Sequence, residues 1–446
     1  MEHIVIIGGI AGGMSAASKL RRLREDVKIT VFEKDEHISY GACGLPYYIS
    51  GVTKSHKDLL ARTVEDFEKR DIKVNTQHEV KKVMPEQKMV LVQNLRTGGT
   101  EEINYDKLLI ATGSKPIVPP FVPKEAENVF TLKTLSDGMK MKEYFQEREN
   151  VKRIAIIGGG YIGMELVETM KELQKEVTVI ELQPQILPNY DQDMAEILEN
   201  SLKERVNILT GEEVQKLHIE NGRVTSVITD KGEYEADAVI VNIGNKPNTE
   251  FVQDIGLEML DNGAIIVDKQ QQTSIPSIYA AGDCATSNHL LLQKPVNIAL
   301  GTTANKHGRV AADNLAGISS FFQGILGTNV VKVMEWTAAM TGLTEKSAKQ
   351  EGLNFKTAKV ETNSHASYYP NALPFHIKLV YEEKTKKLLG AQILGQDESA
   401  AKRIDIYATA ITCGLTTEQI GMLDLSYAPP YATVWDAVQV AANAAK

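Results

Sequence analysis

The chain has 446 residues, 43% of them hydrophobic and 24% charged, which excludes a disordered or fibrous protein and allows about two to four domains. Its 49 basic and 58 acidic side chains give a net charge of −9, so neither nucleic acid nor an anionic membrane is an expected partner. Three cysteines are too few for a disulfide framework, and the apolar N-terminal run is too short for a membrane span or signal peptide, so we expect a cytoplasmic protein.

Residues 3–33 are predicted to form a βαβ unit: an apolar strand, a glycine turn, an amphipathic helix and a second apolar strand that ends at Glu33. Such a unit binds a dinucleotide, because glycines let the backbone approach the pyrophosphate and the helix N-terminus presents N–H groups to it. This copy departs from the G-x-G-x-x-G template, since Ile10 stands at the middle glycine position. The candidate residues are Gly8, Gly9, Ile10, Ala11, Gly12, Gly13, Glu33 and Lys34.

Residues 39–47, Ser-Tyr-Gly-Ala-Cys-Gly-Leu-Pro-Tyr, contain the first cysteine. Small residues flank Cys43, so its sulfur is approachable, and a helix that begins nearby would favour the thiolate. From these residues alone, Cys43 is either a reactive thiol or an inert buried side chain. Cys284, directly after a Gly-Asp pair, and Cys413, in an apolar helical pattern, are expected to be structural.

Further along, residues 108–113 are predicted to form a buried strand that ends in Thr-Gly, and the βαβ pattern then recurs over residues 153–181. This second copy fits the dinucleotide template fully. The carboxylate of Glu181 can bind adenosine ribose hydroxyls and would repel a 2′-phosphate. No Arg or Lys follows over residues 182–187, so NADH is favoured over NADPH. The candidate NAD residues are Gly158, Gly160, Tyr161, Ile162, Gly163 and Glu181, with Gly244 at the exit from this domain.

Residues 278–283 are predicted to form another apolar strand, which ends in Gly-Asp. The carboxylate of Asp283 can accept a hydrogen bond from a ribityl hydroxyl. Two dinucleotide sites in one chain indicate a flavin enzyme, because hydride then passes from nicotinamide to FAD. We assign FAD to the first glycine turn and expect no metal site. The further FAD candidates are Ala111, Thr112, Gly113, Gly282 and Asp283.

The order of these motifs (glycine turn, Ala-Thr-Gly, second glycine turn, Gly-Asp) resembles that of the FAD-dependent pyridine nucleotide–disulfide oxidoreductases over essentially the whole chain. The resemblance implies an α/β fold with two Rossmann-like dinucleotide-binding domains and a C-terminal α+β interface domain. It also implies a homodimer with active sites shared across the interface. With boundaries at Pro- and Gly-rich stretches, FAD binding is expected at residues 1–118 and 248–325, NAD binding at 119–247 and dimerisation at 326–446.

By the same resemblance, residues 39–47 are similar to the redox-cysteine segment of the family. Members similar to glutathione reductase carry a second cysteine five positions later, where this chain has Tyr48, so no dithiol can form within the segment. A lone thiolate can hold a mixed disulfide with a small thiol or become a sulfenic acid. NADH peroxidases and water-forming oxidases carry a histidine at the position of Ala11, so the resemblance favours the mixed disulfide.

Residues 365–370 and 425–431 resemble two tyrosine-containing segments of the coenzyme A disulfide reductases, which reach across the dimer into the partner's site. The resemblance implies catalytic roles for Tyr368 and Tyr427 beside Cys43, because a phenol can donate a proton to a leaving thiolate. Ala42 and Trp435 depart from that subfamily, which can carry Asn and Lys there, so persulfides, polysulfide and related disulfides remain open as substrates. The implied substrate-binding residues are Ser15, Lys19, Arg22, Ser39, Ala42 and Asn305.

The sequence therefore predicts a reductase that passes hydride from NADH, with NADPH as the alternative donor, through FAD to Cys43. The predicted substrate is coenzyme A disulfide or a related small disulfide or persulfide, with coenzyme A held as a disulfide on Cys43. Two alternatives remain open: an NADH oxidase that reduces O₂ at the flavin, and a flavin redox sensor without turnover.

Overall fold

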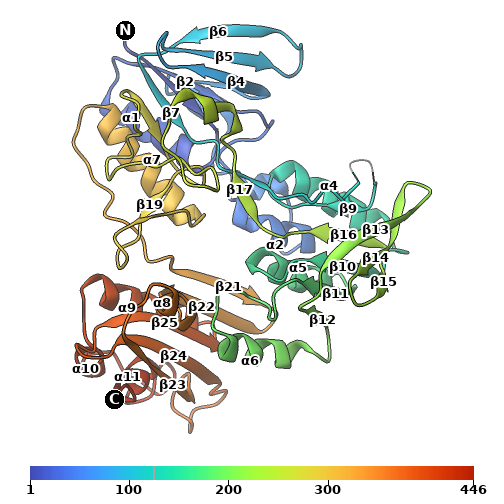
Figure 1. Ribbon diagram of the computed structural model, residues 1–446, viewed down its shortest axis with the longest axis vertical. Helices are drawn as coiled ribbons and strands as arrows, with labels where there is room; N and C mark the ends of the chain where they lie inside the picture. The colour runs from blue at the N-terminus through green and yellow to red at the C-terminus, as the bar shows by residue number, and fades with distance from the viewer. Residues whose placement is uncertain (124–125) are drawn as a thin grey trace. The chain divides into compact units, whose positions relative to one another are not determined.

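The computed structural model describes residues 1–123 and 126–446, and the chain folds into two compact units (Figure 1). Unit 1 comprises residues 1–117, 132–144 and 244–325, and unit 2 comprises residues 118–131, 145–243 and 326–446. Each unit is therefore assembled from stretches that are far apart in the sequence.

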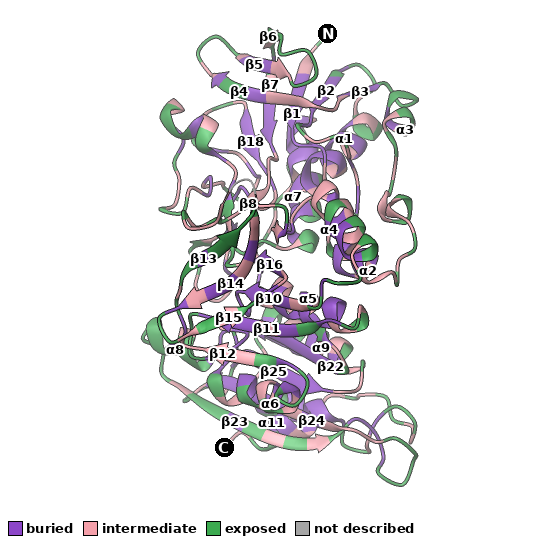
Figure 2. Ribbon diagram, turned by 90° about the vertical axis from the view of Figure 1, so that its right-hand side faces the viewer, coloured by how far each residue is buried: buried purple, intermediate pink, exposed green. Residues whose placement is uncertain are grey.

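A parallel sheet in the order β18-β7-β1-β2-β3 forms the centre of unit 1 (Figure 2). Because β18 pairs with β7, a segment from beyond the second glycine turn completes the sheet that begins at the N-terminus. The strands are β1 (His3–Ile7), β2 (Lys28–Phe32), β3 (Ile72–Asn75), β7 (Lys107–Ile110) and β18 (Ile278–Ala280).

Helices cover one face of this sheet, and an antiparallel layer covers the other. Ile4 of β1 packs in a core cluster with Leu20 of α1 (Ala11–Leu23) and Leu315 of α7 (Gly301–Leu315). Its neighbour Val5 packs in a second cluster with valines of β4 (His78–Met84) and β5 (Met89–Asn94), which pair with β6 (Thr100–Asn104). A strand buried on both faces needs apolar residues throughout, as residues 4–7 of β1 have.

The shorter elements of unit 1 form the turns and crossings around this sheet. They are η1 (Ala42–Gly44), α2 (Leu45–Ser50), η2 (His56–Leu59), α3 (Val64–Glu68), β8 (Ser114–Pro116) paired with β17 (Asn245–Pro247), η3 (Glu250–Ile255), and β19 (Ser287–Asn288) paired with β20 (Pro295–Val296). Helix α4 (Leu135–Glu147) begins in unit 1 and ends in unit 2.

Unit 2 contains a second parallel sheet, in the order β12-β11-β10-β16-β9. Its βαβ core, β10-α5-β11, repeats the arrangement of β1-α1-β2, as the sequence echo predicts. An antiparallel layer, β13-β14-β15, packs on one face. The elements are β9 (Val129–Phe130), β10 (Arg153–Ile157), α5 (Tyr161–Glu172), β11 (Glu176–Glu181), α6 (Gln192–Leu202), β12 (Asn207–Thr210), β13 (Val214–Glu220), β14 (Arg223–Thr229), β15 (Glu233–Glu235) and β16 (Ala238–Val241).

The C-terminal part of unit 2 is an antiparallel sheet, β21-β22-β25-β24-β23, with α9 on β22 and β25 and α11 on β23 and β24. In Figure 2 the inner strands of the sheets are coloured as buried for most of their length. The elements are β21 (Asn329–Val333), β22 (Trp336–Gly342), α8 (Glu345–Gln350), β23 (Phe355–Asn363), β24 (Pro374–Glu382), β25 (Leu388–Gly395), α9 (Ala400–Thr412), α10 (Thr417–Gly421) and α11 (Ala437–Asn443).

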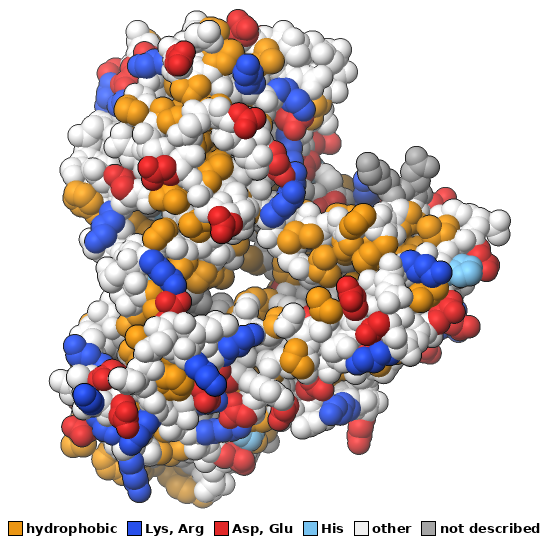
Figure 3. All heavy atoms as spheres, viewed as in Figure 1, with side chains coloured by type: hydrophobic (Ala, Val, Ile, Leu, Met, Phe, Trp, Pro, Cys, Tyr) orange, Lys and Arg blue, Asp and Glu red, His pale blue; other side chains and the backbone are white. Residues whose placement is uncertain are grey.

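Two parallel sheets with crossover helices and one antiparallel α+β sheet confirm the predicted fold class. Acidic and basic side chains are interspersed over the face shown in Figure 3. None of the helices in the described chain combines the length and the apolar composition needed to cross a bilayer.

Candidate active site

The turn between β1 and α1 is packed too tightly for side chains at its outer glycines. Gly8 has a φ of +110°, and a Cβ atom there would collide with the carbonyl oxygen of Ala111. A Cβ atom at Gly13 would collide with the carbonyl oxygen of Gly8. Ile10, the N-cap of α1, makes no side-chain capping hydrogen bond, so the first N–H groups of the helix can serve a bound anion.

The turn before α5 repeats this geometry. Gly158 has a φ of +104°, and a Cβ atom there would collide with the carbonyl oxygen of Asn242, while one at Gly163 would collide with Gly158. At Gly160 an added Cβ atom would meet no heavy atom of the described residues within 4 Å. The middle position of the turn is therefore open in the protein itself, which explains how Ile10 is accommodated at the equivalent place in the first turn.

Each carboxylate expected at a ribose is held by two backbone amides. Glu33 accepts hydrogen bonds from the N–H of Gly9 at 2.6 Å and of Asp35 at 2.9 Å. Glu181 accepts from Gly159 at 2.6 Å and from the residue two positions beyond itself at 2.7 Å. Both side chains are buried, and burial raises the pKa of Glu33. Each oxygen keeps a second lone pair, so both carboxylates can also accept hydrogen bonds from ribose hydroxyls.

A cavity of about 390 Å³ opens beside Glu33 in unit 1. Four residues expected at FAD line it: Gly8, Glu33, Lys34 and Thr112. A cavity next to a glycine turn, an uncapped helix N-terminus and a carboxylate expected at a ribose fits the adenosine part of a dinucleotide.

The Thr-Gly and Gly-Asp strand ends are fixed by neighbouring segments. The Thr112 hydroxyl donates to the carbonyl oxygen of Asn248 at 2.8 Å, and the N–H of Asn248 donates to Gly113 at 2.9 Å. The Asp283 carboxylate accepts hydrogen bonds from Ser114 at 3.0 Å and from Lys133 at 3.1 Å. Gly113, Gly244 and Gly282 have φ of +67°, +116° and +83°, so each of these turns uses a conformation that favours glycine.

Cys43 is exposed and lies in η1, which leads directly into α2. Its segment begins at Ser39, a non-glycine residue with a φ of +50° whose N–H donates to the carbonyl oxygen of Gly9 at 2.9 Å. The carbonyl oxygen of Ser39 accepts the N–H of Ala61 at 2.7 Å. Cys43 and its neighbour Ala42 therefore lie on a segment that is hydrogen-bonded to the first glycine turn.

The other two cysteines have different surroundings. Cys284 is fully buried and donates to the carbonyl oxygens of Ile110 and Ala281, as expected for a structural residue. Cys413 was also expected to be structural, but it is exposed at the C-cap of α9 and is not packed in the core. The helix ends at Thr412, and its last buried residues are Ala410 and Ile411.

Helices α1 and α7 bring together two residues expected at the substrate. The Ser15 hydroxyl donates to the Asn305 side chain at 2.5 Å. The helices approach closely because Gly308 has no side chain: a Cβ atom there would collide with the carbonyl oxygen of Gly12. Residues 290 positions apart thus share one surface.

Two cations expected at the substrate differ in their partners. Lys19 pairs with Asp313 of α7 at 2.6 Å, and both side chains are largely buried. Arg22 is exposed at the end of α1. Arg62 reaches the same helix and donates to the Ser18 hydroxyl at 3.1 Å. Because Asp313 compensates the charge of Lys19, Arg22 is the better placed of the two to bind a phosphate.

The hydroxyl oxygens of Tyr368 and Tyr427 lie 2.9 Å apart, although the residues are 59 positions apart in the sequence. Both side chains are exposed, at 74% and 43%. The hydrogen bond with Tyr368 raises the pKa of Tyr427. The structure thus brings the two predicted catalytic tyrosines together as a pair on the surface of unit 2.

Arg403 of α9 holds the backbones of the two tyrosine segments. Its Nη2 atom donates to the carbonyl oxygens of Ser364 and Tyr431, each at 2.9 Å, and pairs with Asp436 at 2.8 Å. Arg403 and Asp436 are both buried. One guanidinium group therefore fixes the two segments relative to each other.

Comparison with family models supports the same interpretation. The pyridine nucleotide-disulphide oxidoreductase model matches residues 2–308, and the dimerisation domain of that family matches residues 328–438. The chain belongs to the pyridine nucleotide-disulphide oxidoreductases. Membership implies FAD and a pyridine nucleotide as cofactors, and the dimerisation domain suggests a homodimer. The predicted enzyme class is confirmed.

Several relatives of this oxidoreductase carry more specific names. The chain is 37% identical to a NAD(P)H coenzyme A polysulfide/persulfide reductase of Pyrococcus horikoshii, over 100% of this chain and 98% of the relative. It is 32% identical to the coenzyme A disulfide reductase of Staphylococcus aureus, over 100% of both chains. It is 34% identical to an NADH oxidase of Enterococcus faecalis, over 99% of both chains.

Among solved structures, reduced CoADR-RHD of Bacillus anthracis matches with a TM-score of 0.95 and 39% identity, over 99% of this chain and 80% of that chain. Together with the curated relatives, this match confirms the resemblance to the coenzyme A disulfide reductase branch that the motifs indicate.

Two residues near the candidate site of this oxidoreductase escaped the sequence analysis. Lys133 lies in no recognisable motif, and its contact with Asp283 spans 150 positions. His307, fully buried in α7, accepts the N–H of Gly282 on Nδ1 at 3.3 Å and contacts the Ser287 hydroxyl through Nε2 at 2.9 Å. Burial lowers the pKa of His307 to about 4, so it is a neutral residue that holds the Gly-Asp turn.

Glu165 also escaped the sequence analysis. It lies in the first turns of α5, after the second glycine turn. Burial, reinforced by repulsion from Glu168, raises the pKa of Glu165 to about 7. A carboxyl group that titrates near neutral pH beside a nucleotide turn is a candidate functional residue, but no spacing in the sequence singles it out.

Proposed function

We propose that this oxidoreductase is a cytoplasmic homodimer that uses NADH to reduce coenzyme A disulfide, or a related small disulfide or persulfide, through Cys43. The observation that carries the proposal is the placement of Cys43. It is exposed, its segment is hydrogen-bonded to Gly9 through Ser39, and the position where a second cysteine would stand is Tyr48. The names of the Pyrococcus and Staphylococcus relatives support a disulfide or persulfide substrate.

In this proposal, FAD binds to residues 1–118 and 248–325, the pyridine nucleotide binds to 119–247, and residues 326–446 form the dimer. The glycine turns hold the two pyrophosphates, while Glu33 and Glu181 accept hydrogen bonds from the ribose hydroxyls. With no basic residue over 182–187, Glu181 favours NADH over NADPH. When bound, FAD would supply the transfer of two electrons from the nicotinamide to the disulfide on Cys43.

Cys43 carries the substrate half of the reaction. In the resting protein its sulfur is joined to a small thiol, RS, in a mixed disulfide. Two electrons break that S–S bond and leave the Cys43 thiolate and RSH. The thiolate attacks RSSR, re-forms the mixed disulfide and expels a second RS⁻, which takes up a proton. The sum is NADH + H⁺ + RSSR giving NAD⁺ + 2 RSH.

The tyrosine pair supplies the proton in this scheme. Tyr427 of the partner subunit donates to the leaving thiolate, and the partner's Tyr368 holds the phenol by its hydrogen bond. To the bound substrate thiol, Ser15 and Asn305 offer hydrogen bonds, and Arg22 offers a positive charge for a phosphate group. Ser39, Ala42 and Lys19 line the same proposed substrate site.

Intact-protein mass spectrometry before and after reduction tests the proposal. We expect each chain of the untreated protein to carry one small thiol on Cys43, which a reductant removes. The Cys43→Ser variant should carry no adduct, and Cys413→Ser, which changes the other exposed cysteine, should keep it. A mass loss equal to coenzyme A identifies the thiol. Untreated protein without any adduct contradicts the mixed-disulfide scheme.

NADH oxidase activity is the second candidate, since the Enterococcus relative carries that name. Oxygen consumption separates the two. If Cys43→Ser abolishes disulfide reduction and leaves NADH-dependent oxygen uptake unchanged, oxygen is reduced without the cysteine, and the two activities are independent properties of the protein.

A further inference from the structure

The loop after β11, residues 182–190, packs on the second glycine turn. The N–H of Leu187 donates to the carbonyl oxygen of Gly159 at 2.8 Å, while the N–H of Gly159 donates to Glu181. A Cβ atom at Gly159 would lie 3.2 Å from Ile186, so the side chain of Ile186 rests on this glycine. Leu187 has a φ of +46°, a conformation that persists only where surrounding contacts enforce it.

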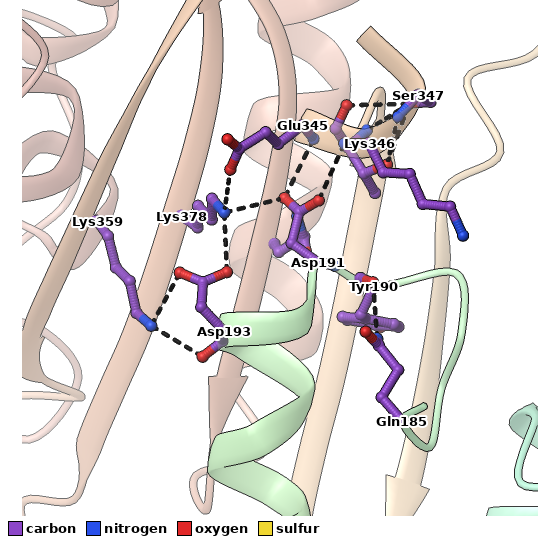
Figure 4. Close-up of polar contacts among 11 residues, drawn as sticks. Gln185, Tyr190, Asp191, Asp193, Glu345, Lys346, Ser347, Lys359 and Lys378 are labelled. Atoms are coloured by element: carbon purple, nitrogen blue, oxygen red, sulfur yellow. Dashed lines mark hydrogen bonds and ion pairs between the residues drawn. The ribbon is translucent and has the colours of Figure 1, made fainter. Parts of the chain in front are cut away.

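The loop also closes on itself just before α6. The N–H of Tyr190 donates to the carbonyl oxygen of Leu187 at 2.8 Å, and the Gln185 side chain donates to the carbonyl oxygen of Tyr190 at 3.0 Å (Figure 4). Tyr190 is 2% exposed. Leu187 is therefore hydrogen-bonded to the residue directly before Asp191.

Asp191 is the anchor of this loop in the C-terminal part of unit 2. Its buried carboxylate accepts the Gln392 side chain at 2.6 Å and the N–H groups of Glu345 at 3.1 Å and Lys346 at 3.3 Å, the first residues of α8. Its own N–H donates to Gln392 at 2.9 Å. Asp191 is thus held from β25 and α8 at once.

Lys378 of β24 supplies the cation for this anchor. The residue is 4% exposed. Its ammonium group pairs with Asp191 at 3.3 Å, Asp193 at 2.8 Å and Glu345 at 2.7 Å (Figure 4). Burial lowers the pKa of Lys378, but hydrogen bonds to Asp193 and Glu345 outweigh it, and the pKa stays above its usual value. Removing Lys378 would leave the carboxylate of Asp191 buried without its cation.

We propose that Asp191 and Lys378 are positioning residues for the pyridine nucleotide. Neither belongs to the glycine turn; they act through residues 182–190 on Gly159 and, through its amide, on Glu181. The inference rests on the proposed placement of the nucleotide at the second turn. Loosening the anchor weakens nucleotide binding, while hydride transfer from nucleotide already bound is unchanged.

Anaerobic rapid mixing of the FAD-loaded protein with NADH separates these two effects, because flavin absorbance reports both the limiting rate and the half-saturating NADH concentration. We expect Lys378→Met to raise the half-saturating concentration about five- to tenfold and to change the limiting rate by less than about twofold. Lys378→Arg, which keeps the charge, should restore most of the affinity. Lys359→Met is the matched control, since Lys359 pairs with Asp193 at 3.0 Å and should leave both values unchanged.

An unchanged half-saturating concentration in folded Lys378→Met protein overturns the inference, even where thermal stability falls. If that variant does not fold, Asp191→Asn, which keeps the shape and loses the charge, replaces it under the same criterion. Glu181→Gln distinguishes the two levels of the proposal. If the half-saturating NADH concentration rises in Glu181→Gln but not in Lys378→Met, the proposed placement of the nucleotide stands and the inference about Lys378 is wrong. If it rises in neither variant, both the placement of the nucleotide and the inference are wrong. None of these measurements uses the disulfide substrate.

Discussion

Ser39 and Leu187 hold equivalent positions in the two halves of the chain. The N–H of each donates to the carbonyl oxygen of the second glycine in its own nucleotide turn, at 2.9 Å to Gly9 and 2.8 Å to Gly159. Both are non-glycine residues in the left-handed region, with φ of +50° and +46°. The internal repeat therefore extends past the second strand of each βαβ unit into the following loop.

The two loops then lead to different places. The first continues from Ser39 into the segment of Cys43, and the second continues from Leu187 to the anchor at Asp191. A contact that holds a nucleotide turn thus also positions the exposed thiol in one half of the chain. We conclude that Ser39 links the first turn to Cys43 through its backbone, whatever its side chain binds.

Substitutions at Ser39 test this link. A β-branched side chain at a φ of +50° costs about 1–2 kcal/mol, whereas glycine adopts that conformation freely. We expect Ser39→Val to change the rate at which iodoacetamide alkylates Cys43 and to lower the temperature of FAD release, and Ser39→Gly to retain both. The measurement uses a Cys413→Ser background, because Cys413 is also exposed.

Leu187→Val is the matched change in the second half and should leave Cys43 alkylation as it is in the parent. If Cys43 in the Ser39→Val variant is alkylated at the same rate as in the parent and the variant retains FAD, the backbone of Ser39 does not position the thiol.

Replacing each carboxylate that is proposed to bind a ribose tests which nucleotide each glycine turn binds. Glutamine at position 33 or 181 would place an NH₂ group against one of the two backbone amides, leaving a buried donor unpaired at a cost of about 1–3 kcal/mol. We expect Glu33→Gln to lose FAD on gel filtration. Glu181→Gln should keep FAD and need more NADH for half-maximal flavin reduction. The reverse pattern would exchange the two assignments.

The glycine turns and the strands around them were predictable because their signals are local. The spacing of Gly158, Gly160 and Gly163, and the acidic residue at the end of the next strand, follow from the geometry of one βαβ unit. The pairing of β18 with β7 is not local, and the pattern of residues 278–283 does not indicate it; only the resemblance to the family placed residues 248–325 in the same domain as residues 1–118.

Other parts of the site have no sequence signal. Arg403 contacts carbonyl oxygens 39 and 28 positions away, and carbonyl oxygens belong to every residue type. The hydrogen bond from Ser39 to Gly9 is likewise made by backbone atoms. Lys19 was expected at the substrate, but its partner Asp313 lies on a helix whose packing on α1 could not be derived from either helix alone.

The tyrosine pair is open to a direct test of proton donation. If Tyr427 is the donor, Tyr427→Phe should lower the rate of disulfide reduction by about 10²–10⁴-fold. The donor must be protonated, so activity is lost as the pH rises through its pKa. Since the hydrogen bond with Tyr368 raises the pKa of Tyr427, Tyr368→Phe should move the alkaline limb of the pH–rate profile to lower pH.

Tyr431→Phe, which changes another exposed tyrosine of the same segment, should leave the profile of disulfide reduction in place. An alkaline limb that is identical in the parent and in Tyr368→Phe would mean that the titrating group is not Tyr427.

His307 should make the fold sensitive to acid. Its pKa is about 4 in the folded chain against 6.5 ordinarily, so below about pH 6.5 the unfolded chain binds a proton that the folded chain does not. Stability is therefore lost as the pH falls, by up to about 1.4 kcal/mol per pH unit until about pH 4.

A glutamine at position 307 can still accept a hydrogen bond from Gly282 and donate one to Ser287, but it does not titrate. Between about pH 7 and about pH 5, His307→Gln should lose less stability to urea than the parent, while His218→Gln, at an exposed site, should match the parent. If His307→Gln and the parent lose equal stability over this pH range, protonation of His307 does not destabilise the folded chain.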